Sequence, residues 1–184
     1  MSKVNSDQAA RQNFPVKLAR KTLEVYLDQS LTIAPPLDTP PVFLKQAGVF
    51  VTLHKQEHLR GCIGTFTPQQ PTIAHEIIAN AISSAVRDPR FEIVHQGELA
   101  SIVISVDILT APERVSSIDE LDPRRYGVIV SKGWQKGLLL PDLAGVDTIE
   151  EQLNIARNKA GLANVPLKKL TIERFTVTRY EETS

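Results

Sequence analysis

Apolar residues recur at helical spacing in three stretches of the chain. The first stripe runs through Pro15–Gln29, the second through residues 73–85 and the third through residues 149–160. Spacings of three and four residues place such side chains on one face of a helix, so each stretch predicts an amphipathic helix. Thr72 precedes the second helix as a suitable N-cap, and Thr148 begins a Thr-x-x-Glu capping box before the third.

In other stretches apolar and polar residues alternate with the period of a strand, or β-branched and aromatic residues are enriched. In chain order they predict a hairpin from residues 48–54 and 59–66, a strand at 99–109, a second hairpin at 126–141 and a closing strand at 170–180. In the strand at 99–109 the even-numbered positions from Ile102 to Ile108 are apolar, whereas Ser105 and Asp107 fall on the other face. We expect the second hairpin to turn between Gly133 and Gly137.

The irregular order of these elements, with no repeated strand–helix–strand unit, predicts an α+β fold built on a mostly antiparallel sheet with flanking helices. The polar start of the chain predicts a flexible N-terminal segment at 1–13, followed by a single folded domain at 14–184. Four prolines within residues 33–41 can neither continue a helix nor donate to a sheet, so we expect an extended surface loop there.

Composition narrows the functional classes. The 184 residues include 21 basic and 21 acidic side chains, and this zero net charge provides no global attraction for nucleic acid or an anionic membrane. One cysteine makes no internal disulfide, and the chain opens on no signal-peptide pattern. The longest apolar run is too short to span a bilayer. We therefore expect a cytoplasmic protein that does not enter the membrane.

The single cysteine lies in the segment His58–Phe66, "HLRGCIGTF". In a regular strand Arg60, Cys62 and Gly64 share one face, and the guanidinium then favours the reactive thiolate of Cys62. Two registers of the hairpin remain open. A two-residue turn at Gln56-Glu57 sets Cys62 opposite Val51 and Arg60 opposite Leu53, whereas a register shifted by one residue sets Cys62 opposite Thr52 and Arg60 opposite His54.

Two glycines inside one strand need a physical reason. Gly61 and Gly64 indicate a bulge, tight packing, or the close approach of a ligand. Cys62 has two interpretations as well: a small buried residue that fills the core, or a reactive or ligand-contacting thiol.

A second candidate group follows the second helix in "DPRF". Asp88 is expected to cap a local turn, and Arg90 either forms a structural salt bridge or clamps an anionic ligand, together with Arg60. The four histidines, including His54, lack the spacing of a metal site, so no protein-borne metal is predicted. Trp134 between two lysines could stack a base, but the charge balance argues against nucleic acid.

Several segments together resemble one family, the AMMECR-domain family, whose bacterial and archaeal members are called AmmeMemoRadiSam system protein A. They are "GVFVTLHKQEHLRGCIGTF", "AISSAVRDPRF", "YGVIVSKG", "GLLLPDLAGVDTIEEQLNIARNKAGL" and "IERFTVTRYEE", and "LRGCIG" is the family signature. The resemblance covers about Pro15 to Glu181 and implies an α+β fold with a larger and a smaller lobe and a cleft that holds the signature. Gln56-Glu57 departs from the Asp-Gly pair of many members.

The resemblance also implies two partners, a Memo-like protein and a radical S-adenosylmethionine protein, and it specifies no cofactor and no established reaction. We therefore expect an accessory component that binds a partner or a small anionic ligand through the LRGCIG cleft. The alternative is an enzyme that uses Cys62 as nucleophile or intermediate carrier, with Arg60 lowering its pKa and Arg90 holding an anionic substrate. A nucleic-acid-associated protein is the second alternative.

Overall fold

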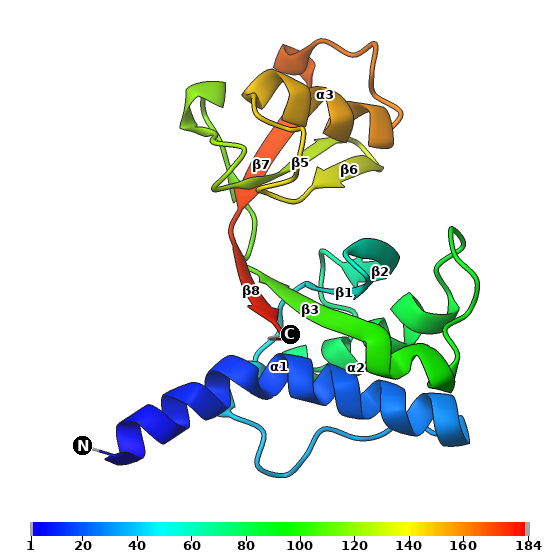
Figure 1. Ribbon diagram of the computed structural model, residues 1–184. Helices are drawn as coiled ribbons and strands as arrows, with labels where there is room; N and C mark the ends of the chain where they lie inside the picture. Colours follow the sequence, from blue (N-terminus) through cyan, green and yellow to red (C-terminus); the bar gives the residue numbers. More distant parts are fainter. Residues whose placement is uncertain (1, 183–184) are drawn as a thin grey trace. The chain divides into compact units, whose positions relative to one another are not determined.

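Helices and strands alternate irregularly in the computed structural model, which describes residues 2–182 (Figure 1). The helices are α1 (Ser2–Gln29), α2 (Ile73–Val86) and α3 (Ile149–Lys159). The strands are β1 (Val49–Lys55), β2 (His58–Thr65), β3 (Ile102–Leu109), β4 (Glu113–Arg114), β5 (Gly127–Lys132), β6 (Gln135–Leu139), β7 (Thr171–Phe175) and β8 (Val177–Glu181). Short 3₁₀ turns are η1 (Pro41–Leu44), η2 (Gln96–Ser101), η3 (Ile118–Glu120) and η4 (Leu167–Lys169).

The chain divides into two compact units, each with its own four-stranded sheet. Unit 1 comprises the described residues up to Ile108 and from Thr178 onward, and unit 2 comprises Leu109–Val177. The sheet orders are β2-β1-β3-β8 and β4-β7-β5-β6. The pairings β1–β2, β1–β3, β5–β6 and β5–β7 are antiparallel, so the predicted α+β class is confirmed.

The core of unit 1 lies between its sheet and the helices α1 and α2. One face of the sheet contributes alternate residues of β1 and β3 to this core, including Val51, Leu53 and Ile104, all fully buried. Because side chains alternate along a strand, Thr52 and Ser105 belong to the face turned away from the helices. The even-numbered residues of β3 face the core as expected, but the strand is not buried on that face alone, because Ser105 and Asp107 on its other face are only 5% and 1% exposed.

The core of unit 2 is smaller and lies between α3 and its sheet. Val128, Val130 and Leu153 are buried there. The Thr148 side chain accepts from the backbone N–H of Glu151, whose carboxylate in turn accepts from the Thr148 backbone, as the capping box predicts. This unit holds none of the signature residues.

Three sequence expectations differ from the structure in their boundaries. Helix α1 begins at Ser2 and contains Pro15, so the described residues 2–13 of the predicted flexible segment have helical backbone; the flexibility of this segment stays a prediction. The closing strand is two strands, β7 and β8, in different sheets. The second hairpin turns at Gly133-Trp134 alone; Gly133 has a φ of +60°, and Gly137 lies inside β6.

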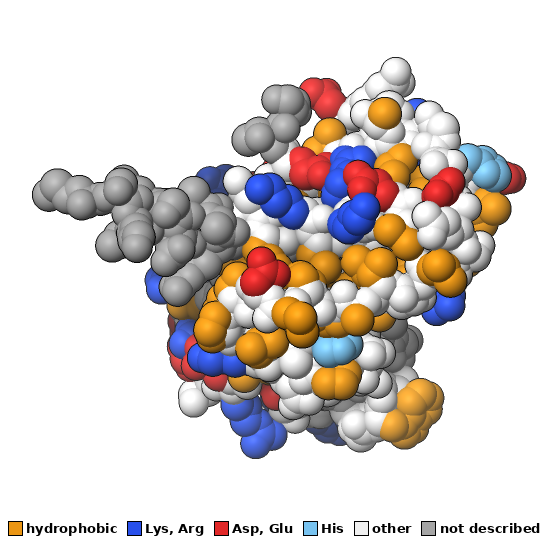
Figure 2. All heavy atoms as spheres, turned by 90° about the horizontal axis from the view of Figure 1, so that it is seen from below, with side chains coloured by type: hydrophobic (Ala, Val, Ile, Leu, Met, Phe, Trp, Pro, Cys, Tyr) orange, Lys and Arg blue, Asp and Glu red, His pale blue; other side chains and the backbone are white. Residues whose placement is uncertain are grey.

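The connection between α1 and β1 carries exposed apolar side chains, as the proline-rich sequence leads one to expect for a surface segment. Leu31, Leu37, Val42 and Leu44 are all exposed. Figure 2 shows apolar side chains gathered on the face that contains this connection, with basic and acidic side chains interspersed beside them. Among the described residues, no helix has both the length and the apolar character needed to cross a membrane.

Candidate functional site

The signature residues lie on β2, an edge strand that pairs with β1. Lys55 pairs with His58, and Gln56 and Glu57 have φ values of +50° and +64°, so the two-residue turn is of type I′. Farther along the hairpin, however, Cys62 pairs with Thr52. The structure therefore combines the short turn of one predicted register with the cysteine pairing of the other.

A β-bulge at Arg60 explains how the short turn and the Cys62–Thr52 pairing occur in the same hairpin. His54 pairs with Leu59 and Leu53 pairs with Gly61, which leaves Arg60 without a partner in the ladder. The prediction that Arg60 shares a face with Cys62, or faces Leu53 or His54, is therefore wrong. Because the bulge adds one residue, Leu59 takes the place beside Cys62 on the open face of the sheet.

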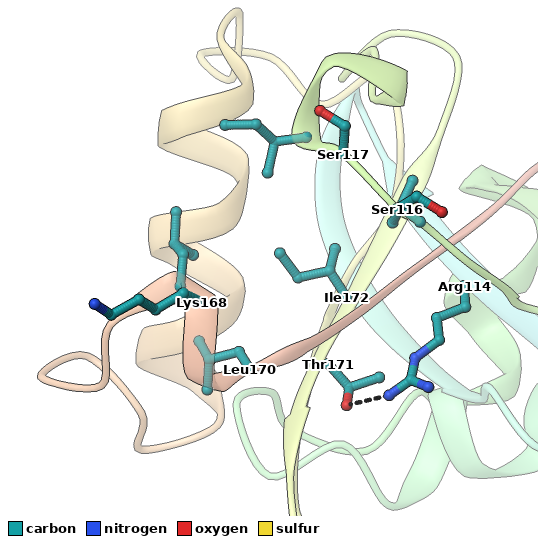
Figure 3. A pocket seen from close by; sticks show the side chains of 10 residues that line it. Arg114, Ser116, Ser117, Lys168, Leu170, Thr171 and Ile172 are labelled. Atoms are coloured by element: carbon teal, nitrogen blue, oxygen red, sulfur yellow. Dashed lines mark hydrogen bonds between the residues drawn. The ribbon is translucent and has the colours of Figure 1, made fainter.

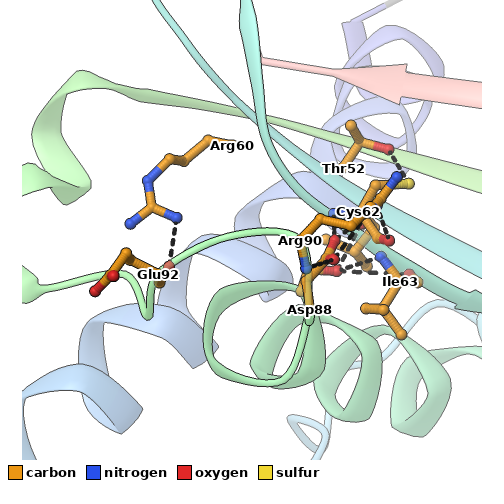
Figure 4. Close-up of polar contacts among 9 residues, drawn as sticks. Thr52, Arg60, Cys62, Ile63, Asp88, Arg90 and Glu92 are labelled. Atoms are coloured by element: carbon orange, nitrogen blue, oxygen red, sulfur yellow. Dashed lines mark hydrogen bonds and ion pairs between the residues drawn. The ribbon is translucent and has the colours of Figure 1, made fainter.

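The Arg60 side chain points away from the Cys62 sulfur (Figure 4). Its Nη2 donates to Glu98 Oε1 at 2.7 Å and to the carbonyl of Ile93 at 3.1 Å, and its Nη1 donates to the carbonyl of Glu92 at 2.7 Å. Burial of Glu98 opposes its ionisation, but hydrogen bonds from Arg60 and Lys55 outweigh this effect and lower the pKa of Glu98 to about 2. Arg60 thus fastens the loop after α2 to the signature strand.

Asp88 and Arg90 hold the peptide groups of Cys62. The backbone N–H of Cys62 donates to Asp88 Oδ2 at 2.9 Å, and Arg90 Nη2 donates to the Cys62 carbonyl at 3.0 Å. Arg90 also forms a bidentate ion pair with Asp88, whose side chain is only 2% exposed. The Arg90 guanidinium, helped by the Cys62 N–H, holds the pKa of Asp88 well below its usual range.

Asp88 and Arg90 provide β2 with hydrogen-bond partners that a neighbouring strand would otherwise provide. On the outer edge of a sheet, N–H and C=O groups are left without partners and attract other chains. Asp88 satisfies the outward N–H of Cys62 and Arg90 satisfies its outward carbonyl. The predicted cap at Asp88 and salt bridge at Arg90 therefore have a common role, which is to close the sheet edge at the cysteine.

Both glycines of the signature are explained by close packing. A Cβ atom at Gly61 would lie 2.2 Å from the Ser84 carbonyl oxygen of α2, and one at Gly64 would lie 2.2 Å from Cγ of the Phe50 ring. The Ser84 hydroxyl enters the ladder itself: it accepts from the Ile63 N–H at 2.9 Å and donates to the Val51 carbonyl at 2.7 Å. Of the predicted reasons, the structure shows both a bulge and tight packing.

Cys62 is partly exposed, and its sulfur accepts a hydrogen bond from the Thr52 hydroxyl at 3.2 Å. His54 lies on the same face, opposite Leu59. Over the described residues, no cluster of three histidine, cysteine or acidic side chains has the arrangement of a metal site. The structure therefore brings Cys62, Asp88, Arg90, Gly61 and Gly64 together with Thr52, while the guanidinium of Arg60 faces elsewhere.

Several pockets lie apart from the cysteine. One in unit 2, of about 280 Å³, is lined by residues that include Arg114, Ser116, Lys168 and Thr171, and Arg114 donates there to the Thr171 hydroxyl at 3.2 Å (Figure 3). Another, of about 480 Å³, lies in unit 1 beside Arg20. A smaller pocket, of about 200 Å³, is bordered by Gly64 of the signature.

Sequence reasoning missed Glu98 and Ser84 as partners of the signature. Glu98 and Ser84 are far from β2 in the chain and have no motif of their own, since ordinary helical and loop patterns surround them. Thr52 was visible only as a possible pairing partner. The alternation of β3 placed Ser105 away from the apolar face of its own strand, and only the pairing of β3 with β1 sets Ser105 opposite Thr52.

A family model described as AMMECR1 matches residues 16–180. The chain belongs to the AMMECR1 family. A Thermotoga maritima relative is 52% identical over 90% of this chain and 96% of its own length. The crystal structure of uncharacterized protein PH0010 from Pyrococcus horikoshii aligns with a TM-score of 0.84 and 38% identity, covering 92% of this chain and 90% of that one.

Another AMMECR1 relative is much longer than this chain. Protein CA_C1420 from Clostridium acetobutylicum is 48% identical over 91% of this chain, but the match covers only 36% of that protein. The chain therefore spans about a third of the Clostridium protein. The predicted family and its α+β fold are confirmed by these matches.

Proposed function

We propose that this AMMECR1-family protein is a binding component that acts with a Memo-like protein and a radical S-adenosylmethionine protein, and that the surface of the signature strand is its docking site. The observation that carries the proposal is that the charged side chains around Cys62 are already paired with one another. Arg60 is paired with Glu98, and Arg90 is paired with Asp88, within the same unit. Together these four side chains hold the outer edge of β2 in place.

Apolar side chains remain exposed beside this rigid edge. Leu59 is 40% exposed on the open sheet face, and Ile93 is 52% exposed in the loop that Arg60 fastens to β2. Arg90 lies within 5.3 Å of the Phe91 ring and has a half-exposed side chain. Exposed aliphatic groups next to a rigidly held arginine are typical of protein–protein contacts. The longer Clostridium relative adds support, because there the domain is joined to further protein.

The enzyme alternative needs Arg60 beside the thiol and Arg90 free for an anionic substrate. Both guanidinium groups are instead bound to carboxylates, which weakens their attraction for a second anion. For the same reason we favour a protein partner over a small anionic ligand at this edge. Trp134 is 92% exposed, but Lys132 and Lys136 lie on opposite faces of its hairpin, because they pair with Gln135 and Ser131. This geometry does not strengthen the nucleic-acid alternative.

The test is direct binding of the purified Memo-like and radical S-adenosylmethionine proteins, measured by titration calorimetry. We expect Leu59→Asp to weaken binding at least about tenfold, because an apolar anchor at the centre of an interface becomes charged. Leu37→Asp is the matched control, since Leu37 is fully exposed outside the signature region. Failure of the wild-type chain to bind either protein, or equal effects of the two variants, would refute the proposal.

A further inference from the structure

Two adjoining pockets lie in unit 2. The first, shown in Figure 3, has a volume of about 280 Å³, and the second has a volume of about 340 Å³. Ile118 and Leu167 line both of them, so the two pockets form one elongated cavity, which we call the unit 2 groove. Small-molecule sites in proteins have volumes of about 300–1,000 Å³, and the groove as a whole falls in this range.

The walls of the unit 2 groove are mainly aliphatic. In the first pocket, Val115, Leu170 and Ile172 are partly buried residues that pack against the margin of the unit 2 core. In the second pocket, Ile149 and Leu153 of α3 line the wall. Covering such concave aliphatic surface removes it from water, so the walls favour a ligand with an apolar body.

Charged side chains are distributed unevenly along the groove. The charged residues that line the first pocket are Arg114 and Lys168, both basic, and Figure 3 shows them on opposite sides of the pocket. In the second pocket the two acidic side chains of Asp119 and Glu150 outnumber the one basic side chain, Arg157. An anionic group is therefore attracted to the first pocket and repelled from the second.

Arg114 has the position and the free charge to bind that anionic group. Glu173 is opposite Arg114 on β7, but the guanidinium donates instead to the Thr171 hydroxyl of the pocket wall at 3.2 Å. No ion pair in the described part of the chain includes Arg114, and the carboxylate of Glu120 is paired with Arg174. Arg114 can therefore form a charge-assisted hydrogen bond with a carboxylate that enters the pocket.

The backbone at the rim of the first pocket argues against a peptide as the ligand. The N–H groups of Ser116 and Ser117 both donate to Glu120 Oε1 at 2.9 Å, and the Val115 N–H donates to the Ile172 carbonyl at 3.1 Å. A peptide in the groove would place its own amide groups against aliphatic walls, and burying an amide without a hydrogen bond is unfavourable. A hydrocarbon chain has no polar groups to bury.

From these observations we infer that the unit 2 groove binds an aliphatic carboxylic acid. Arg114 binds the carboxylate, and the hydrocarbon chain lies against Leu170 and Ile172 and continues past Ile118 toward the second pocket. The inference goes beyond the proposed function, because every residue that lines the groove belongs to unit 2, whereas the signature strand belongs to unit 1.

Octanoate is the probe that tests the site, titrated into the full-length ¹⁵N-labelled chain and followed by the amide signals. We expect shifts at residues 167–172, and binding at least about tenfold tighter than that of butanoate, because the longer chain buries more apolar surface. Octan-1-ol has an aliphatic chain of the same length without a charge, so we expect it to bind about tenfold more weakly than octanoate.

Arg114→Gln is expected to weaken octanoate binding about tenfold and to leave octan-1-ol binding unchanged. Arg114 is exposed and forms one side-chain hydrogen bond, to Thr171, so we expect the variant to fold, and its melting temperature checks this. Lys169→Gln is the matched control, because Lys169 is an exposed cation next to Lys168 that lines neither pocket. It should bind octanoate as the wild-type chain does.

Several results would overturn the inference. They are no binding of octanoate, shifts confined to residues outside the groove, equal affinity for octanoate and octan-1-ol, and wild-type affinity in the Arg114→Gln variant. Tighter binding of the peptide acetyl-Ala-Leu-Leu than of octanoate would also overturn it, because the groove would then be a peptide site. These measurements use no partner protein and leave Leu59 unchanged, so their failure is distinct from failure of the docking proposal.

Discussion

At the scale of single residues, the charged groups of the signature region act as structural ties. Arg60 joins Glu98 and two loop carbonyls, whereas Asp88 and Arg90 join the two peptide groups of Cys62. Each tie crosses a large distance in sequence, between β2 and the segment after α2. Their main effect is to hold the cysteine backbone in one position while its side chain stays on the open face.

The ion pair between Arg60 and Glu98 predicts that the protein loses stability in acid. The folded pKa of about 2 lies below the ordinary value of 4.5, so the carboxylate stabilises the fold above pH 4.5, and this contribution is lost as the pH falls from 4.5 toward 2. We expect Glu98→Gln to reduce the free energy of unfolding at pH 7 by on the order of 2 kcal/mol and to flatten its acid dependence. Urea denaturation at several pH values measures both.

Glu92→Gln is the control for this prediction, because Glu92 takes part in the Arg60 network only through its backbone carbonyl. It should retain the pH dependence of the wild-type chain. A Glu98→Gln variant with the unchanged acid dependence of the wild type would show that the ion pair contributes nothing measurable.

At the scale of elements, the contact between β2 and α2 defines the signature. Helix α2 approaches β2 so closely that the Ser84 carbonyl occupies the space that a side chain at Gly61 would need. The Ser84 hydroxyl also bonds to the backbone of both β1 and β2. The glycine spacing was visible in the sequence, but its cause was not, because the helix that requires it begins eight residues after the strand ends.

Gly61→Ala is expected to force these two elements apart. Since the added Cβ would lie 2.2 Å from a backbone oxygen, which has no freedom to rotate away, we expect a loss of about 1–3 kcal/mol in the free energy of unfolding. Chemical denaturation measures the loss. Gly97→Ala, where nothing lies within 4 Å of the added atom, should stay close to the wild type. Equal stability of the two variants would contradict the close packing.

At the scale of the whole molecule, the fold consists of two units with separate cores. Unit 2 is inserted between β3 and β8 of unit 1, and its hydrophobic cluster includes Val128, Val130 and Leu153. The sequence predicted its hairpin and capped helix but gave no sign that the closing strand divides between two sheets. That division depends on pairing with distant strands, which a continuous strand pattern does not reveal.

Because unit 2 has its own core and sheet, a fragment of residues 109–177 is expected to fold without the rest of the chain. Domains of about 60 residues are marginal, so we expect a cooperative but low-temperature melting transition. Circular dichroism during heating, together with the dispersion of amide proton signals, measures folding. A non-cooperative melt with collapsed signals would show that the core of unit 2 depends on unit 1.

The sequence alone determined the class of the fold, the three amphipathic helices, the two hairpins and the caps at Thr72 and Thr148, because each of these depends on neighbours within a few residues. It also located the signature around Cys62. Only the tertiary structure decided that Arg60 forms a bulge and turns to Glu98, that Leu59 lies beside the cysteine, and that Ser105 lies opposite Thr52. These features arise where strands and loops far apart in the chain meet, and local patterns carry no information about which distant group each side chain reaches.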